Sequence, residues 1–175
     1  MSAYNPELHH RRSIRLRGYD YTQSGAYYIT VCTQDRLCLF GDIDDGVLTL
    51  NRAVQMVRDV WDELPLYYPD VEVDAIVVMP NHIHGTLVLL DQQEAPRTGT
   101  RLSLPDIVAR FKSLTTTLYR KGVYESGWQP FPGKLWQRDY YEHIIRGEDE
   151  LNKVREYIYY NPARWHQDEN NPDTW

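Results

Sequence analysis

Two apolar runs separated by only two residues constrain the fold of this chain more than any other feature. Val71–Met79 and His82–Leu90 flank Pro80-Asn81, a pair suited to the centre of a tight turn. A connection this short makes the two runs adjacent antiparallel strands. Because both runs are apolar almost throughout, we expect them to be central strands of a sheet that is covered on both faces.

The other elements are predicted from turn signals, caps and hydrophobic periodicity. The remaining strands are runs of β-branched and aromatic residues, expected over Ala26–Thr33, Leu135–Tyr140 and a hairpin of Phe40–Ile43 with Val47–Leu50. Three helices are expected: one capped by Asn51 and ending before Pro65, one from Ser103 and Asp106 to about Lys121 with Gly122 as its terminator, and one from Gly147-Glu148 to Pro162. The order is β-α-β-β-α-β with one extra hairpin and one extra helix. This order predicts an α+β fold with a ferredoxin-like antiparallel sheet and helices on one side.

Length and composition favour a single domain over residues 1–175. The chain has 42% hydrophobic and 25% charged residues, which is ordinary for a globular protein. We interpret residues 1–24 as a basic and aromatic arm and residues 163–175 as a tail. No apolar run approaches the roughly 20 residues that span a bilayer, and the N-terminus lacks the apolar segment of a signal peptide. We therefore expect a cytoplasmic protein without a membrane partner, nucleoid-associated when it is bound to DNA.

The formal net charge of −6 argues against a polyanionic partner, but the charges are unevenly distributed. Nine acidic residues lie between Asp42 and Asp74, against only Arg52 and Arg58. Basic residues gather elsewhere, and the candidates for contacts with DNA are Arg11, Arg12, Arg15, Arg17, Arg110, Lys112 and Arg138. The cations of the N-terminal arm are followed by Tyr19 and Tyr21, and this mixture of cations with stackable rings is used to bind single strands. Solvated helix and loop faces are the alternative interpretation of these clusters.

His82 and His84 are the first candidates for chemistry. Strand side chains alternate, so both imidazoles face the same side of the sheet. Two neutral imidazoles about 6 to 7 Å apart on a strand can bind a divalent cation if a third ligand arrives from elsewhere. A hydrogen-bonded structural pair is the alternative, and a structural role is the expectation for His143.

Tyr157 and Asn161 are the second candidates, because they lie one turn apart on one face of the last helix. We expect this helix to cover the sheet face that carries the two histidines. Asn161 would then offer an amide oxygen as third ligand, and Tyr157 a phenol oxygen close to the cation. Such a cation can polarise a phosphodiester, and a tyrosine can attack it to form a covalent intermediate. Tyr159 and Tyr160 are rival nucleophiles, but neither lies a full turn from Asn161.

Three ordered motifs give the chain a family resemblance that covers nearly its whole length. Pro80-Asn81-His82-Ile83-His84-Gly85, Leu135-Trp136-Gln137-Arg138-Asp139-Tyr140-Tyr141 and Tyr157-Ile158-Tyr159-Tyr160-Asn161-Pro162 resemble motifs of the single-tyrosine, HUH-type transposases of insertion sequences. The branch it resembles most is that of the REP-associated tyrosine transposases. The resemblance implies that His82 and His84 bind Mg²⁺ or Mn²⁺, and that Tyr157 attacks single-stranded or hairpin DNA to give a 5′-phosphotyrosine and a free 3′-OH. Asn161 stands where the classic enzymes carry a glutamine metal ligand.

Two other functions remain open at this point. A non-catalytic module that binds hairpin DNA or RNA would share the fold, and the asparagine at position 161 together with the acidic net charge favours it. A replication-initiator or relaxase-like nickase would share the histidine pair and the tyrosine. The resemblance also allows a homodimer, so Tyr157 could reach His82 within one chain or between two.

Overall fold

The computed structural model describes residues 16, 18–45, 47–91 and 102–174. Four strands form an antiparallel sheet in the order β4-β5-β1-β6: β1 (Gly25–Cys32), β4 (Val71–Val78), β5 (His82–Leu89) and β6 (Tyr141–Ile145). The strands β2 (Gly41–Asp44) and β3 (Val47–Leu50) pair as a separate hairpin. The helices are α1 (Arg52–Asp62), α2 (Leu64–Tyr67), α3 (Leu104–Ser126) and α4 (Glu148–Tyr160), with 3-10 turns η1 (Gln34–Arg36), η2 (Pro162–Gln167) and η3 (Pro172–Thr174). The ferredoxin-like α+β prediction, with its extra hairpin and helix, is confirmed.

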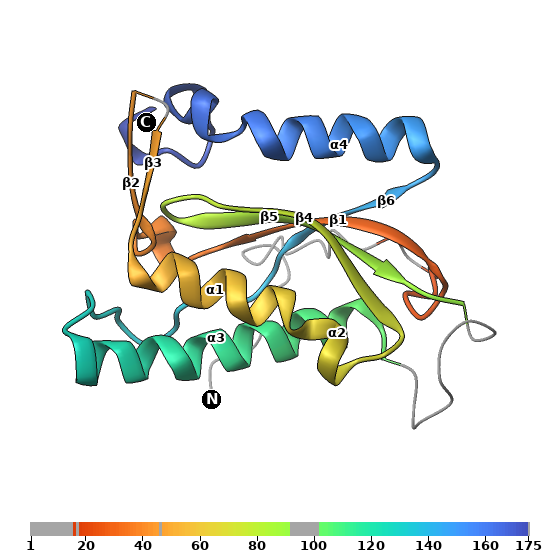
Figure 1. Ribbon diagram of the computed structural model, residues 1–175, viewed down its shortest axis with the longest axis horizontal. Helices are drawn as coiled ribbons and strands as arrows, with labels where there is room; N and C mark the ends of the chain where they lie inside the picture. The colour runs from red at the N-terminus through yellow and green to blue at the C-terminus, as the bar shows by residue number, and fades with distance from the viewer. Residues whose placement is uncertain (1–15, 17, 46, 92–101, 175) are drawn as a thin grey trace, which may run out of the picture.

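Helices cover both faces of the sheet, as Figure 1 shows. α1 and α3 lie together on one face, where Ile83 and Leu87 of β5 are buried in the main core. α4 crosses the opposite face and packs through Ile158 against Val77 and Met79, which form a smaller second core. The last helix therefore covers the face on which the histidines were expected.

The edge strand β4 differs from its prediction as a central strand. It pairs only with β5, and its register shifts between Val73 and Ile76. Val71 and Val73 pack in the main core before the shift, and Ile76 and Val78 pack there after it. Ala75, Val77 and Met79 contact the second core instead. The run is continuously apolar after the bulge because both faces of this edge strand are covered, one by the main core and the other by the second core under α4.

Arg155 of α4 forms two salt bridges: the one with Asp74 fixes the helix on the sheet, and the one with Glu148 lies within the helix. The Arg155 guanidinium donates from Nε and Nη2 to Asp74 of the β4 bulge at 2.7 to 3.1 Å, and from Nη1 to Glu148 at 3.2 Å. Both carboxylates are partly exposed, so these pairs orient the helix more than they stabilise the fold.

The predicted helix starts are confirmed by their caps. Asn51 Oδ1 accepts from Val54 N at 3.0 Å, and Ser103 with Asp106 forms a capping box. α1 ends at Asp62, before Pro65 as predicted, and Pro65 lies in the first turn of the next short helix α2, where a missing N–H costs little.

Gly122 does not terminate the helix predicted from Ser103 to about Lys121, because α3 runs on to Ser126. The left-handed residue that ends the helix is Gly127, with φ at 66°. Gly122 is instead a packing position: an added Cβ would collide with the Trp128 indole.

The strand predicted over Leu135–Tyr140 is wrong, since β6 begins only at Tyr141. Trp136 makes a single bridge to Thr33. The next three carbonyl groups, of residues 137 to 139, accept from the Lys112 ammonium at 3.1 to 3.4 Å and so turn away from the sheet. Within the described ranges, no helix is both long and apolar enough to cross a membrane.

Candidate active site

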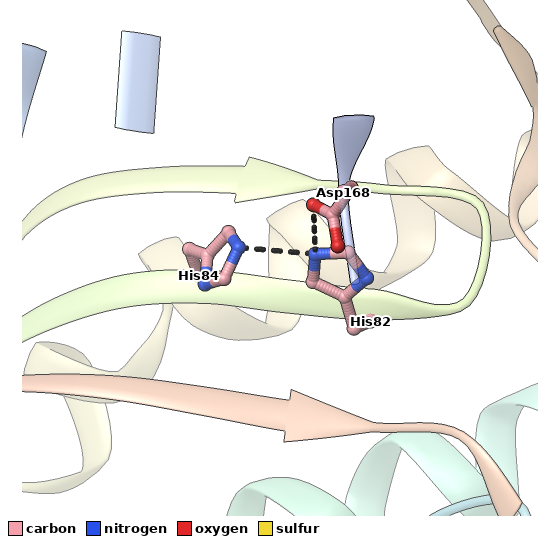
Figure 2. Close-up of side chains that lie close together, drawn as sticks. All are labelled: His82, His84 and Asp168. Carbon is pink, nitrogen blue, oxygen red and sulfur yellow. Dashed lines mark hydrogen bonds and ion pairs between the residues drawn. The ribbon is translucent and has the colours of Figure 1, made fainter. Parts of the chain in front are cut away.

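His82 and His84 lie side by side on β5 and face α4 (Figure 2). Both are buried, with 0% and 3% of their surfaces exposed. Their Nε2 atoms are 3.0 Å apart, and the two rings meet edge to face. The prediction that both imidazoles share one face of the strand is confirmed.

The proton on His82 is placed by Asn81, the residue before it. The Asn81 amide nitrogen donates to the carbonyl groups of Arg36 at 3.0 Å and Asn170 at 2.7 Å. These two bonds orient the amide, so its oxygen is the atom 2.8 Å from His82 Nδ1. His82 must therefore donate from Nδ1, and its Nε2 carries a lone pair.

The hydrogen-bond partners of His84 do not fix its tautomer in the way that Asn81 fixes that of His82. Its Nδ1 lies 2.7 Å from the Tyr28 hydroxyl and 2.8 Å from the Thr30 hydroxyl, both on β1. A hydroxyl can donate or accept, so these contacts allow either neutral tautomer of His84. Since His82 Nε2 bears a lone pair, the 3.0 Å contact between the rings requires a proton on His84 Nε2 or a cation between the two nitrogens.

Burial keeps both imidazoles neutral. Desolvation lowers the pKa of His82 from 6.5 to about 3, and for His84 burial followed by the nearby His82 lowers the pKa to a similar value. Neutral imidazoles are the form that ligates metals.

Asp168 completes a group that could hold a metal ion, and sequence reasoning missed it. Its Oδ2 lies 3.6 Å from His82 Nε2, and the ligand atoms of His82, His84 and Asp168 all fall within 4.8 Å of one another (Figure 2). A neutral His82 forms no ion pair, and 3.6 Å is too long for a hydrogen bond. No proton therefore lies between His82 Nε2 and Asp168, and both atoms are available to a cation.

This donor set suits a divalent cation. Adjacent ligands about 2.1 Å from an octahedrally coordinated ion lie roughly 3.0 Å apart, which matches the separation of the two Nε2 atoms. Asn161 adds a further donor, because its Oδ1 is buried without a hydrogen-bond partner in the described part of the chain. Whether Asn161 is a ligand stays a prediction.

Tyr157 lies beside this group in the same chain. Its ring centroid is 5.3 Å from that of His84 and 6.2 Å from that of Tyr28. Burial raises the pKa of the Tyr157 phenol, while hydrogen bonds from the side chains of Asn161 and Tyr28 oppose the rise. The phenol is thus protonated at neutral pH, and both neighbours stabilise its ionised form.

The rival tyrosines are placed differently. Tyr159 and Tyr160 pack edge to face on each other at 4.9 Å, and neither lines the cleft into which Tyr157 projects. Tyr159 is 77% exposed.

A cleft of about 990 Å³ opens from this group between the sheet and α4. Its lining includes Tyr28, Tyr157 and Asn161, and the cations among its lining residues are Arg36, Lys153 and Arg164. His143 lines it as well, with Nε2 2.7 Å from Glu150, a surface pair that ties β6 to α4.

Among the described residues predicted to bind DNA, none of Arg110, Lys112 and Arg138 lines this cleft. Arg11, Arg12, Arg15 and Arg17 lie outside the described residues. Arg110 on α3 stacks over Tyr68, on the far side of the sheet, and Lys112 holds the loop before β6. Arg138 is exposed between the cleft residues Gln137 and Asp139. Contacts of these residues with DNA stay predictions.

Comparison with known proteins identifies relatives. A family model described as "Transposase IS200 like" matches residues 51–161. An uncharacterized protein of Haemophilus influenzae is 38% identical over 183 residues, which span 96% of this chain and 97% of that protein. A second protein of the same organism, provisionally named a REP-associated tyrosine transposase, is 28% identical over 152 residues, which span 83% of this chain and 74% of that protein.

One solved structure shares the fold. It is that of a REP-associated tyrosine transposase bound to a REP hairpin, with a TM-score of 0.57 and 22% identity. The match covers 86% of this chain and 73% of that one.

Proposed function

The chain belongs to the family of IS200-like transposases, of the REP-associated tyrosine transposase type, and from this premise we propose that it cleaves and rejoins single-stranded DNA through Tyr157. The proposed substrate is DNA that contains a hairpin, because the structural relative is bound to one. The observation that carries the proposal is the contact of Tyr157 with His84 in one cleft.

The residues that would hold a divalent cation are His82, His84 and Asp168, with Asn161 as a further donor. Mg²⁺ or Mn²⁺ bound there supplies positive charge that polarises a phosphodiester. We therefore propose that activity requires one of these metals.

The protein's own groups account for the covalent step. The Tyr157 phenol oxygen attacks the phosphorus and loses its proton to solvent, while hydrogen bonds from Asn161 and Tyr28 stabilise the phenolate that forms. The bond from phosphorus to the 3′-oxygen breaks, and this oxygen takes a proton to become a free 3′-OH. The 5′-phosphate stays on Tyr157, and attack by a 3′-OH on that phosphotyrosine reverses the step and joins strands.

Covalent trapping tests the proposal. Labelled hairpin DNA with single-stranded flanks, mixed with the protein and Mg²⁺ or Mn²⁺, should give a protein–DNA adduct that survives denaturation. Tyr157→Phe should abolish the adduct, and the matched control Tyr159→Phe should form it normally. An undiminished adduct from Tyr157→Phe would show that another residue is the nucleophile.

The same samples separate the alternatives. Hairpin binding that is insensitive to EDTA, with no adduct in Mn²⁺, would identify a non-catalytic binding module. Cleavage that requires an origin-like nick site in plasmid DNA would identify a replication-initiator or relaxase-like nickase.

We further propose that each active site is built from one chain, whatever the oligomeric state. Tyr157 and His84 are in contact within the chain, and the helix that carries Tyr157 is anchored to β4 of the same chain through Arg155. A mixture of Tyr157→Phe and His82→Ala proteins should then remain inactive. Recovery of activity in the mixture would require sites shared between subunits.

A further inference from the structure

Tyr28 contacts both His84 of the histidine pair and Tyr157, the proposed nucleophile. It lies on β1, next to Thr30, whose backbone pairs with His84. The Tyr28 ring stacks on the His84 imidazole with centroids 5.7 Å apart and an interplanar angle of 21°, and its hydroxyl is 2.7 Å from His84 Nδ1. The Tyr28 ring also meets the Tyr157 ring edge to face with centroids 6.2 Å apart, and hydrogen bonding from the Tyr28 side chain acts to lower the pKa of the Tyr157 phenol.

The single proton of this hydroxyl cannot be donated to both neighbours at once. When His84 donates from Nε2 to His82, its Nδ1 has a lone pair and accepts a proton from a neighbouring hydroxyl. When the lone pairs of both Nε2 atoms face a cation, the His84 proton is on Nδ1. The Tyr28 hydroxyl can then no longer donate to His84, so its own proton becomes available to Tyr157.

Thr30 differs from Tyr28 in one useful respect. Its hydroxyl is 2.8 Å from His84 Nδ1 and donates to the Tyr28 oxygen at 3.2 Å. It can satisfy the imidazole in either tautomer, but no contact links it to Tyr157. The hydrogen-bonded connection from His84 to Tyr157, the proposed nucleophile, is therefore made by the Tyr28 hydroxyl.

We propose that Tyr28 is a positioning residue whose hydroxyl couples occupancy of the metal site to alignment of Tyr157. Without an ion the hydroxyl donates to His84, and with an ion it accepts from His84 and donates to Tyr157. His84 stays neutral throughout, because its proton changes nitrogen by exchange with water and none is gained or lost. The inference rests on the proposed function for the identity of the nucleophile, but not for the link between Tyr28 and His84.

Nuclear magnetic resonance tests the coupling without any reaction. In protein labelled with ¹⁵N at histidine and ¹³C at tyrosine, Mg²⁺ should move the His84 proton from Nε2 to Nδ1 and shift the Tyr157 ring signals. In Tyr28→Phe, which keeps the ring and loses only the hydroxyl, the Tyr157 signals should no longer respond to Mg²⁺. Tyr159→Phe, the matched loss of a phenol hydroxyl outside the cleft, should respond as wild type does. An unchanged Tyr157 response in Tyr28→Phe would overturn the proposal.

Single-turnover kinetics of adduct formation give the second readout. At saturating Mg²⁺, Tyr28→Phe should form the adduct about 10 to 100 times more slowly, the usual range for groups that orient a metal ligand. Its half-saturating DNA concentration should stay within about threefold of wild type, because the hydroxyl acts on the attacking group. Tyr159→Phe, which removes a phenol hydroxyl outside the cleft, should form the adduct at a rate within about threefold of wild type.

These outcomes separate the two hypotheses. An adduct rate in Tyr28→Phe within twofold of wild type would overturn the positioning role even if Tyr157 is the nucleophile. If wild type forms no adduct, the proposed function fails, and the tautomer of His84 and the response of the Tyr157 signals still decide whether the coupling exists.

Discussion

Replacing Gly85 by alanine should destabilise the protein through one steric conflict. Gly85 follows His84 on β5 and faces the main core, where the Trp61 indole of α1 lies directly against its backbone. A Cβ built at this position would be 2.5 Å from Trp61 Cη2, 2.6 Å from Cζ2 and 3.2 Å from Cζ3. Trp61 is fully buried and its ring meets Phe111 edge to face at 5.6 Å, so the indole has little room to retreat.

The expected cost follows from two opposing effects. Alanine in a strand gains about 0.5 to 1 kcal/mol over glycine from the smaller loss of backbone freedom. Overpacking a well-filled core costs about 1 to 3 kcal/mol, and two contacts near 2.5 Å on a buried ring favour the upper end. We expect Gly85→Ala to lower the free energy of unfolding by about 2 kcal/mol, which corresponds to a Tm about 4 to 8 °C lower for a domain of this size.

Urea unfolding of four proteins tests the cause as well as the size of this effect. Wild type, Gly85→Ala, Trp61→Phe and the double variant form a cycle. Phenylalanine leaves space for the new methyl group and removes the indole N–H, which is buried without a partner among the described residues. The double variant should therefore be at least about 1 kcal/mol more stable than the sum of the single effects predicts. Additive effects, or a cost of Gly85→Ala below about 0.5 kcal/mol, would refute the steric reasoning.

Three further predictions concern the histidine group. In EDTA, stability should fall as the pH drops below 6.5 toward about 3, because His82 and His84 stay neutral in the folded protein and take up protons on unfolding. The loss should reach about 2 to 4 kcal/mol at pH 5. Asp168→Asn should weaken Mn²⁺ binding at least about tenfold by calorimetry, since it removes an anionic donor, whereas the matched Asp173→Asn should not. Asn81→Ala should cost about 2 to 3 kcal/mol in urea unfolding, because it leaves buried hydrogen-bonding groups unpaired.

Each of these has a clear contrary outcome. A variant with glutamine at both His82 and His84 should lose the excess acid sensitivity, and retention of the full slope would assign it to other groups. Equal Mn²⁺ affinities for Asp168→Asn and wild type would exclude Asp168 from the metal site. A cost below about 0.5 kcal/mol for Asn81→Ala would mean that water replaces the amide in its three hydrogen bonds.

The predictable part of the fold is the part encoded by local signals. The tight turn at Pro80-Asn81 and the caps Asn51 and Ser103 act on residues within a few positions of themselves, so their elements begin where the sequence indicates. The pairing of His82 with His84 follows in the same way from strand alternation. The docking of α4 over them could be inferred because that sheet face needed cover, and the contact of Tyr157 with His84 depends on that docking.

The failures come from contacts between residues far apart in sequence. Leu135–Tyr140 has the composition of a strand, but Lys112 takes up the carbonyl groups that a strand would pair. Gly122 is a residue type that often terminates helices, but here the Trp128 indole packs directly against its backbone. Asp168 lies among polar residues without periodicity, and only the fold of the chain after α4 brings it to His82.

The bulge in β4 has a consequence for how this chain tolerates insertions and deletions. The stretch from Val73 to Ile76 has one residue more than the stretch of β5 that it faces. Deleting one residue there would therefore give a regular strand whose apolar residues keep their faces. A deletion of Asp74 would nevertheless remove the carboxylate that anchors Arg155 of α4, so it should loosen the helix that carries Tyr157 without disturbing the pairing of the sheet.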